Sequence, residues 1–137
     1  MKKISEHISY EEASRSQTSV RKGILNIPNE HELKNMEIVA KACFEPLREW
    51  YGKPLMVSSF FRCEALNSAI GGQRNSQHVQ GKAIDIDTGS KEKNEKLFNW
   101  AKLNLKFDQL LDEFDFSWVH ISFDIGHNRN QVIHIKK

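Results

Sequence analysis

The first half of the chain carries apolar residues at helical spacing. Over residues 33–50 they recur every three or four positions, which predicts a long helix with one face toward the core. Asn29 and Glu32 form a capping box at its start, and Gly52 is placed to end it. Pro46 interrupts the pattern and predicts a bend or a restart, because proline removes one backbone donor.

Shorter patterns predict the remaining elements. The predicted helices cover residues 10–14, 62–70 and 91–103, and the predicted strands cover residues 55–59, 83–87, 107–114, 117–123 and 131–135. The third and fourth of these strands form a hairpin, and the last is an edge strand. Helices come first and antiparallel strands dominate later, so we expect an α+β fold with N-terminal helices packed on a central antiparallel sheet. Without repeats or linkers, residues 1–137 form one domain.

Composition excludes several classes of function. A formal net charge of +2 is too near neutral for a nucleic-acid surface. No run approaches the roughly 20 apolar residues that a spanning helix requires, so we expect no membrane insertion. The N-terminal lysines precede no apolar stretch, so we expect synthesis in the cytoplasm without a signal peptide. We also expect a monomer with two reduced cysteines, Cys43 and Cys63.

The segment 76–87 carries the first candidate chemistry. His78 lies in a polar loop, and Gly81 lets the backbone there pass close to another group. Strand alternation places Asp85 between two isoleucines, where an unpaired charge is costly, so this aspartate needs a partner. The partner is either a cation shared with His78 or a buried arginine, in which case His78 is an ordinary solvated loop residue.

A second histidine lies far downstream in an apolar run. His120 follows Trp118 on the predicted strand 117–123, where it is either a half-exposed sheet residue or a further ligand. Together with His78 and Asp85 it completes two imidazoles and one carboxylate. That is the ligand set of a catalytic zinc that keeps one position open for water. We therefore expect one zinc ion at this site. The histidines at positions 7, 31, 127 and 134 are weaker candidates.

A zinc hydrolase also needs a general base and a group that holds the substrate. Glu113 on the predicted hairpin is favoured as the base, with Asp112 and Asp115 as competitors because the turn length is uncertain. Arg62, at the start of a predicted helix, is suited to gripping a substrate carboxylate, the alternative being a surface ion pair. Asn67 either supports the loop or binds substrate.

These residues resemble the zinc D-Ala-D-Ala carboxypeptidase-like peptidases. The motifs that carry the resemblance are Ser58-Ser59-x-x-Arg62, Leu66-Asn67, Gly71-Gly72, Ser76-x-His78-x-x-Gly81-x-Ala83-x-Asp85 and Trp118-Val119-His120. The resemblance covers nearly the whole chain and is nearest to the compact branch that includes phage endolysins. It implies that His78, Asp85 and His120 are the zinc ligands and that Arg62 binds substrate or stabilises the transition state. Ser59, Asn67, Ser76 and Trp118 are then expected to contribute to substrate binding.

One position departs from the wider family. Many relatives place the catalytic glutamate three residues before the last histidine, where this chain has Ser117. The compact branch instead has an acid after a Gln-Leu-hydrophobic pair, which matches Gln109 to Glu113 and supports Glu113 as the base.

The resemblance implies hydrolysis of peptidoglycan stem peptides, at either a D-Ala-D-Ala or an L-Ala-D-Glu bond. Such an enzyme would act on the cell wall, after phage-mediated release if it is an endolysin. The alternatives are a non-catalytic module that binds cell-wall peptides and a structural component of a phage.

Overall fold

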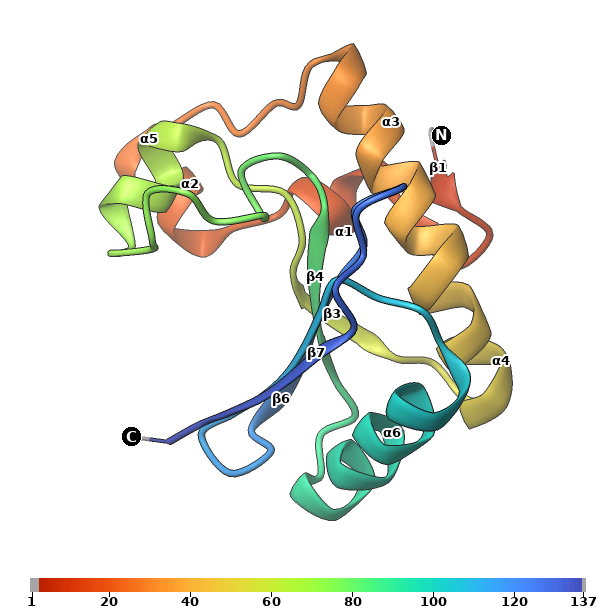
Figure 1. Ribbon diagram of the computed structural model, residues 1–137. Coiled ribbons are helices and arrows are strands. Elements are labelled where there is room, and N and C mark those ends of the chain that lie inside the picture. Colours follow the sequence, from red (N-terminus) through yellow and green to blue (C-terminus); the bar gives the residue numbers. More distant parts are fainter. Residues whose placement is uncertain (1–2, 137) are drawn as a thin grey trace.

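The computed structural model describes residues 3–136 and is built around one five-stranded sheet (Figure 1). The strands lie in the order β3-β4-β6-β5-β7. Their bounds are β3 Met56–Ser59, β4 Ala83–Asp87, β5 Gln109–Glu113, β6 Trp118–Ser122 and β7 Gln131–Ile135. All neighbouring pairs are antiparallel except β5 and β7, which run parallel. The predicted α+β fold with a central, mostly antiparallel sheet is confirmed.

The helices and a small N-terminal hairpin complete the chain. Their bounds are β1 Lys3–Ser5, β2 Ile8–Ser9, α1 Tyr10–Ser14, α2 Gln17–Lys22, α3 Glu30–Val39, the π-helical turn η1 Ala40–Phe44, α4 Glu45–Tyr51, α5 Glu64–Ala69 and α6 Lys91–Asn104. The sequence analysis did not predict β1, β2 or α2. Among residues 3–136, no helix combines the length and apolar character needed to cross a bilayer.

The long N-terminal helix forms with a local defect. Asn29 caps α3, and Glu32 reaches back to the Asn29 backbone, so the predicted capping box is present. The π-helical turn η1 separates α3 from α4 and lies next to Pro46. A proline ring clashes with the carbonyl four residues earlier, here Ala42 inside η1, so a widened turn relieves the conflict. Gly52 ends α4 in a left-handed conformation, as predicted.

The helices divide between the two faces of the sheet. Helices α3, α4 and α6 cover one face, while α2 and α5 lie on the other side of the molecule and cover only part of theirs (Figure 1). The covered face supplies the main core, where the side chains of Ile84, Ile86, Leu110, Val119 and Ile121 have no exposed surface. Burying these side chains contributes about 1.5–3 kcal/mol each relative to exposure.

Strand register determines which side chains share the partly open face. Asp85 lies opposite His120, His120 opposite Leu111, and Leu111 opposite Ile133. Because directly opposed residues of neighbouring strands point to the same side, these four form one row across the sheet. We call this side the site face.

Candidate metal centre

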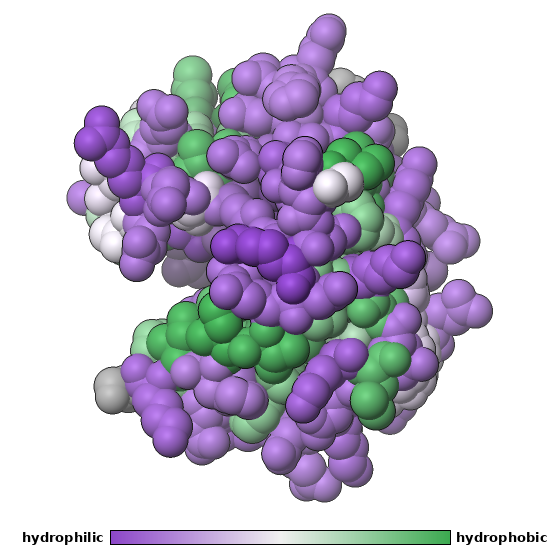
Figure 2. All heavy atoms as spheres, in the orientation of Figure 1, coloured by the Kyte–Doolittle hydropathy of each residue, from purple (hydrophilic) through white to green (hydrophobic). Residues whose placement is uncertain are grey.

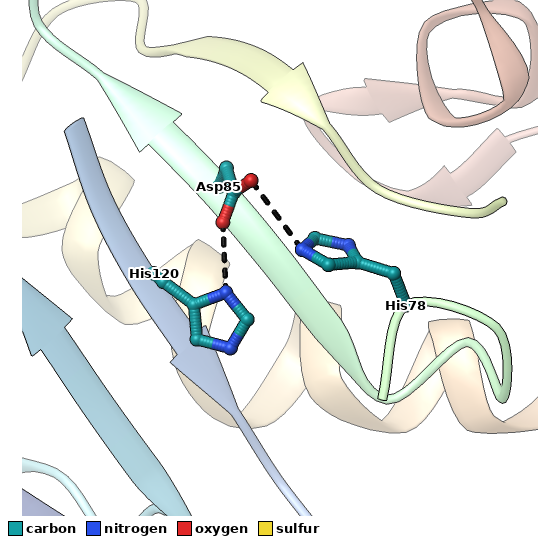
Figure 3. Close-up of side chains that lie close together, drawn as sticks. All are labelled: His78, Asp85 and His120. Carbon is teal, nitrogen blue, oxygen red and sulfur yellow. Dashed lines mark hydrogen bonds and ion pairs between the residues drawn. The ribbon is translucent and has the colours of Figure 1, made fainter. Parts of the chain in front are cut away.

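Three residues from separate segments converge on the site face (Figure 3). His78 comes from the loop between α5 and β4, Asp85 from β4 and His120 from β6. All three are buried, with exposed fractions of 2%, 7% and 8%. Their ligand-type atoms lie within 4.8 Å of one another. The sequence analysis named these three residues as metal ligands, and the structure brings them together.

The backbone of β3 and the following loop orient His78. Its Nδ1 lies 2.7 Å from the carbonyl oxygen of Phe60, which can only accept, so Nδ1 carries the proton and donates. The backbone nitrogen of Arg62 in turn donates to the carbonyl of His78. With Nδ1 engaged, Nε2 points toward Asp85 (Figure 3). A histidine ligand in a metal site is commonly fixed in this way, through a hydrogen bond from its other ring nitrogen.

Gly81 permits the loop to close against α3. It adopts φ +75°, and a side chain there would place its Cβ 2.6 Å from the carbonyl oxygen of Glu32. The glycine is therefore required both by its left-handed conformation and by close contact with the α3 backbone. The predicted close approach at Gly81 is confirmed, and it fixes the loop that carries His78.

Asp85 lies between the two imidazoles. Its Oδ1 is 2.9 Å from Nδ1 of His120, and its Oδ2 is 3.3 Å from Nε2 of His78. Burial on its own would raise the pKa of the Asp85 carboxyl, but the charge of His78 and the hydrogen bond from His120 hold the pKa below its usual range. The pocket therefore favours an ionised carboxylate, which is the form that ligates a metal.

The donor set fits a cation. Among the residues that the structure describes, Nε2 of His78 is buried and has no hydrogen-bond partner, since its 3.3 Å contact with Asp85 lacks the required geometry. A lone pair facing a carboxylate oxygen at this distance is repulsive unless a proton or a cation lies between them. Nitrogen and oxygen ligands about 2.0–2.1 Å from a tetrahedral zinc ion lie roughly 3.3 Å apart, close to the spacing found here.

Of the three candidate bases, only Glu113 lies beside this cluster. Its Oε1 is 3.9 Å from Nδ1 of His120. Asp112 points to the opposite face, where it accepts hydrogen bonds from the Phe116 backbone and His134. Asp115 is exposed and lies 3.8 Å from Lys91. Their positions leave Asp112 and Asp115 unable to act on the same site.

The environment of Glu113 suits proton transfer. Burial and the negative charge of Asp85 raise the pKa of this carboxyl above its ordinary value, against the opposing charges of His120 and Arg62. A carboxyl whose pKa is moved toward neutral pH is a better general base and acid than a fully solvated one.

Arg62 lies just before α5 rather than within it. The sequence analysis expected the helix to begin at Arg62, but α5 begins at Glu64, because Cys63 occupies the cap position in an extended conformation. Burial lowers the pKa of the Arg62 guanidinium, while the charges of Asp85 and Glu113 raise it, which places Arg62 within electrostatic reach of both carboxylates.

Two predicted substrate-binding residues hold Arg62 in place. Nη1 of Arg62 donates to Oδ1 of Asn67 at 3.0 Å, and Nε donates to Oγ of Ser59 at 3.3 Å. Asn67 is 4% exposed and also donates to the Gln73 carbonyl. Gly72 leaves room for this contact, since a Cβ there would lie 2.1 Å from Oδ1 of Asn67. Asn67 and Ser59 therefore act on the arginine side chain in this structure.

The last two predicted substrate-binding residues frame the site. Oγ of Ser76 accepts a hydrogen bond from the His78 backbone nitrogen, so Ser76 supports the loop. Trp118 is half-buried and lies opposite Glu113 in the β5–β6 pair, with its ring against Phe114. The sequence analysis missed the Phe60 carbonyl that orients His78. No side-chain signal could have revealed it, because the group belongs to the backbone.

Comparison with known proteins agrees with this geometry. A family model described as peptidase M15 matches residues 6–122, a range that contains all three clustered residues, Arg62 and Glu113. A search of curated proteins finds no match. The match spans most of the chain, and M15 peptidases are zinc-dependent hydrolases of the D-Ala-D-Ala carboxypeptidase-like type. The chain belongs to the peptidase M15 family.

Proposed function

We propose that this protein is a zinc peptidase that hydrolyses peptide bonds in peptidoglycan stem peptides, at a D-Ala-D-Ala or an L-Ala-D-Glu bond. The observation that carries the proposal is the buried group of His78, Asp85 and His120, with Glu113 3.9 Å from His120, inside the residues matched by the peptidase family. A binding module would have no need of a general base beside three buried ligand-type side chains.

His78 would hold the zinc ion through Nε2, His120 through Nδ1 and Asp85 through its carboxylate. A zinc ion held there would supply Lewis acidity, which would lower the pKa of a water molecule toward about 7 and polarise the carbonyl of the scissile bond. Glu113 takes the proton from the attacking water and then donates it to the departing amine. Its half-buried position supports both steps, because burial raises the pKa of its carboxyl above the ordinary value.

Arg62 anchors a carboxylate of the substrate. Ser59 and Asn67 fix its guanidinium through Nε and Nη1, and the remaining nitrogen, Nη2, would meet the substrate carboxylate. A planar guanidinium that is held on one side presents its remaining donors in a defined direction. In both candidate bonds the leaving residue carries a carboxylate. Arg62 would therefore favour substrates with a carboxylate on the leaving-group side.

The substrate lies in the cell wall. We expect the protein to be made in the cytoplasm as a monomer and to reach the wall by release from the cell, in keeping with its likeness to compact phage-type endolysins.

Metal analysis combined with digestion of peptidoglycan tests the proposal. The purified protein should contain about one zinc per chain. Mass spectrometry of digested stem peptides should show new termini at one type of bond, and this activity should vanish with a chelator and return with zinc. A protein that binds wall peptides without zinc and without cleavage would overturn the proposal in favour of a binding module.

A further inference from the structure

We propose that Leu111, Ile133 and Ile135 form a subsite for a small aliphatic side chain, on the residue that contributes the scissile carbonyl. We call these three residues the apolar strip. The inference rests on the proposed function and adds to it the residues that select the substrate on the side of the metal centre away from Arg62.

Strand register places the apolar strip beside the metal centre. Leu111 lies directly opposite His120 in the β5–β6 pair, and Ile133 lies opposite Leu111 in the β5–β7 pair. Ile135 is likewise opposite Glu113. Since opposed residues share a face, the apolar strip continues the row of Asp85 and His120 toward the β7 edge of the sheet.

The apolar strip lies where the sheet is not fully covered. Ile133 and Ile135 are half-buried, and Leu111 is 9% exposed. Figure 2 shows a notch that opens on the left of the molecule, and a patch of apolar surface follows its lower side over the position of β7 in Figure 1. An apolar surface that continues from a polar catalytic centre is typical of a substrate subsite.

The charges around the site give the substrate a direction. Within residues 109–113 and 131–135, the side chains on the site face are Gln109, Leu111, Glu113, Gln131, Ile133 and Ile135. Glu113 is the single charged group among these six residues, so β5 and β7 offer no cation on this face to an acidic side chain. Arg62 lies on the side of β3 and α5 and supplies the positive charge there. A charged side chain over the apolar strip would lose hydration without gaining a partner.

The chemistry of the two candidate bonds fits this direction. In D-Ala-D-Ala and in L-Ala-D-Glu, an alanine contributes the carbonyl, and the leaving residue carries the carboxylate. With the leaving residue toward Arg62, the alanine methyl group lies toward the apolar strip. Apolar packing of this kind favours a matching side chain by about tenfold or more over a mismatched one.

A charge reversal in the apolar strip tests the inference. The zinc-loaded protein would be assayed on paired synthetic stem peptides that carry alanine or glutamate at the carbonyl-contributing residue. The wild type should prefer alanine in kcat/KM, and Ile133→Lys should reduce the ratio of alanine to glutamate by about tenfold or more, because lysine pairs with the acidic side chain. Leu103→Lys is the matched control, since Leu103 is 82% exposed on α6 and should leave the ratio unchanged.

The ratio of kcat/KM for the alanine and glutamate peptides distinguishes a failure of the proposed function from a failure of the subsite. Both peptides are measured on one sample, so partial unfolding of the variant cancels. A wild type that cuts neither peptide contradicts the proposed function itself. A wild type that cuts them, with the same ratio in Ile133→Lys and in Leu103→Lys, contradicts the subsite and leaves the peptidase proposal intact. An unchanged ratio also in Ile135→Thr would complete that refutation.

Discussion

Among residues 3–136, two clusters of histidine and carboxylate have ligand-type atoms close enough to hold a metal ion. One is the buried group of His78, Asp85 and His120, and the other consists of Glu6, His7 and Glu45 near the N-terminus. In the second cluster Glu6 and His7 are exposed and Glu45 is half-buried. Proximity of atoms alone therefore does not distinguish the two.

Hydrogen bonding distinguishes them. In the second cluster, Oε2 of Glu45 accepts from the Ser5 hydroxyl at 2.6 Å and from the His7 backbone at 2.9 Å, and Oε1 is 2.6 Å from Nδ1 of His7. Both oxygens of the Glu45 carboxylate thus already have partners within the protein. In the buried cluster, Nε2 of His78 lacks any hydrogen-bond partner among the described residues.

The hydrogen-bonding state of the ligand-type atoms, and not their proximity alone, marks a metal centre. A carboxylate whose partners are all supplied by the protein performs a structural task, here tying the N-terminal hairpin to α4. A buried ring nitrogen that faces a carboxylate without a hydrogen bond is costly until a proton or a cation lies between the two groups.

Replacing one histidine in each cluster should give opposite results. His120→Ala should reduce bound zinc from about one per chain to nearly none and abolish peptide hydrolysis, because it removes one of three protein ligands. His7→Ala should retain both zinc and activity. Metal content by mass spectrometry and release of amines from peptidoglycan measure the two effects. Equal loss of zinc in both variants would show that both clusters are needed to hold the metal, which contradicts the contrast between them.

Removing the neighbouring carboxylate should separate metal binding from catalysis. Glu113→Gln should keep the zinc and lower kcat by about 10²–10⁴-fold, the range for loss of a general acid–base. Asp115→Asn, on the adjacent hairpin turn, is the control and should retain wild-type kcat because Asp115 is exposed and faces away. A fully active Glu113→Gln enzyme would exclude Glu113 as the base.

A conservative change beside the buried cluster should have an intermediate effect. Arg62→Lys keeps the charge but loses the planar guanidinium that Ser59 and Asn67 hold, so kcat/KM should fall by about 10–100-fold with zinc content unchanged. Arg74→Lys, at an exposed position in the following loop, serves as the control. Steady-state kinetics on one stem peptide would decide, and equal values for the two variants would argue against a directional role for Arg62.

The smallest expected effect is the contribution of the second cluster to the free energy of unfolding of the protein. Burial on its own would raise the pKa of the Glu45 carboxyl. The hydrogen bonds from Ser5 and His7 outweigh this effect and hold the pKa below its ordinary value of 4.5. A lowered pKa stabilises the fold above pH 4.5, and this stabilisation is lost as pH falls through the folded pKa. Glu45→Gln should lower the free energy of unfolding at pH 7 by about 1 kcal/mol and flatten its dependence on acid pH.

Urea unfolding of the Glu45→Gln variant at pH 7 and at pH 4 measures both effects, and zinc content and hydrolysis should stay at wild-type levels. A loss of zinc in this variant would show that the two clusters are not independent.

Patterns with a local physical origin were predicted well from sequence. The capping box at Asn29 is present, because a cap depends on residues within three positions of each other. The hairpin of β1 and β2 was missed, since two strands of two or three residues have no readable period and depend on the distant Glu45. Alternation also identified β7 without indicating its parallel pairing with β5.

The types of candidate ligand, and the strand positions of Asp85 and His120, follow from the amino-acid sequence alone. The period of two along β4 and β6 fixes Asp85 and His120 on one face each, and Gly81 marks the loop that brings His78 to them. These features follow from covalent geometry and local sterics, which act over a few residues.

Only the tertiary structure decided which carboxylate meets the histidines. The choice among Asp112, Glu113 and Asp115 depends on the register of β5 with β6, because a slip of one residue would exchange the two faces. That register is set across a turn in which three successive residues, Phe114, Asp115 and Phe116, adopt positive φ values of 52°, 57° and 60°. Non-glycine residues rarely adopt such angles, so packing of the whole hairpin, and no local preference, brings Glu113 to the site.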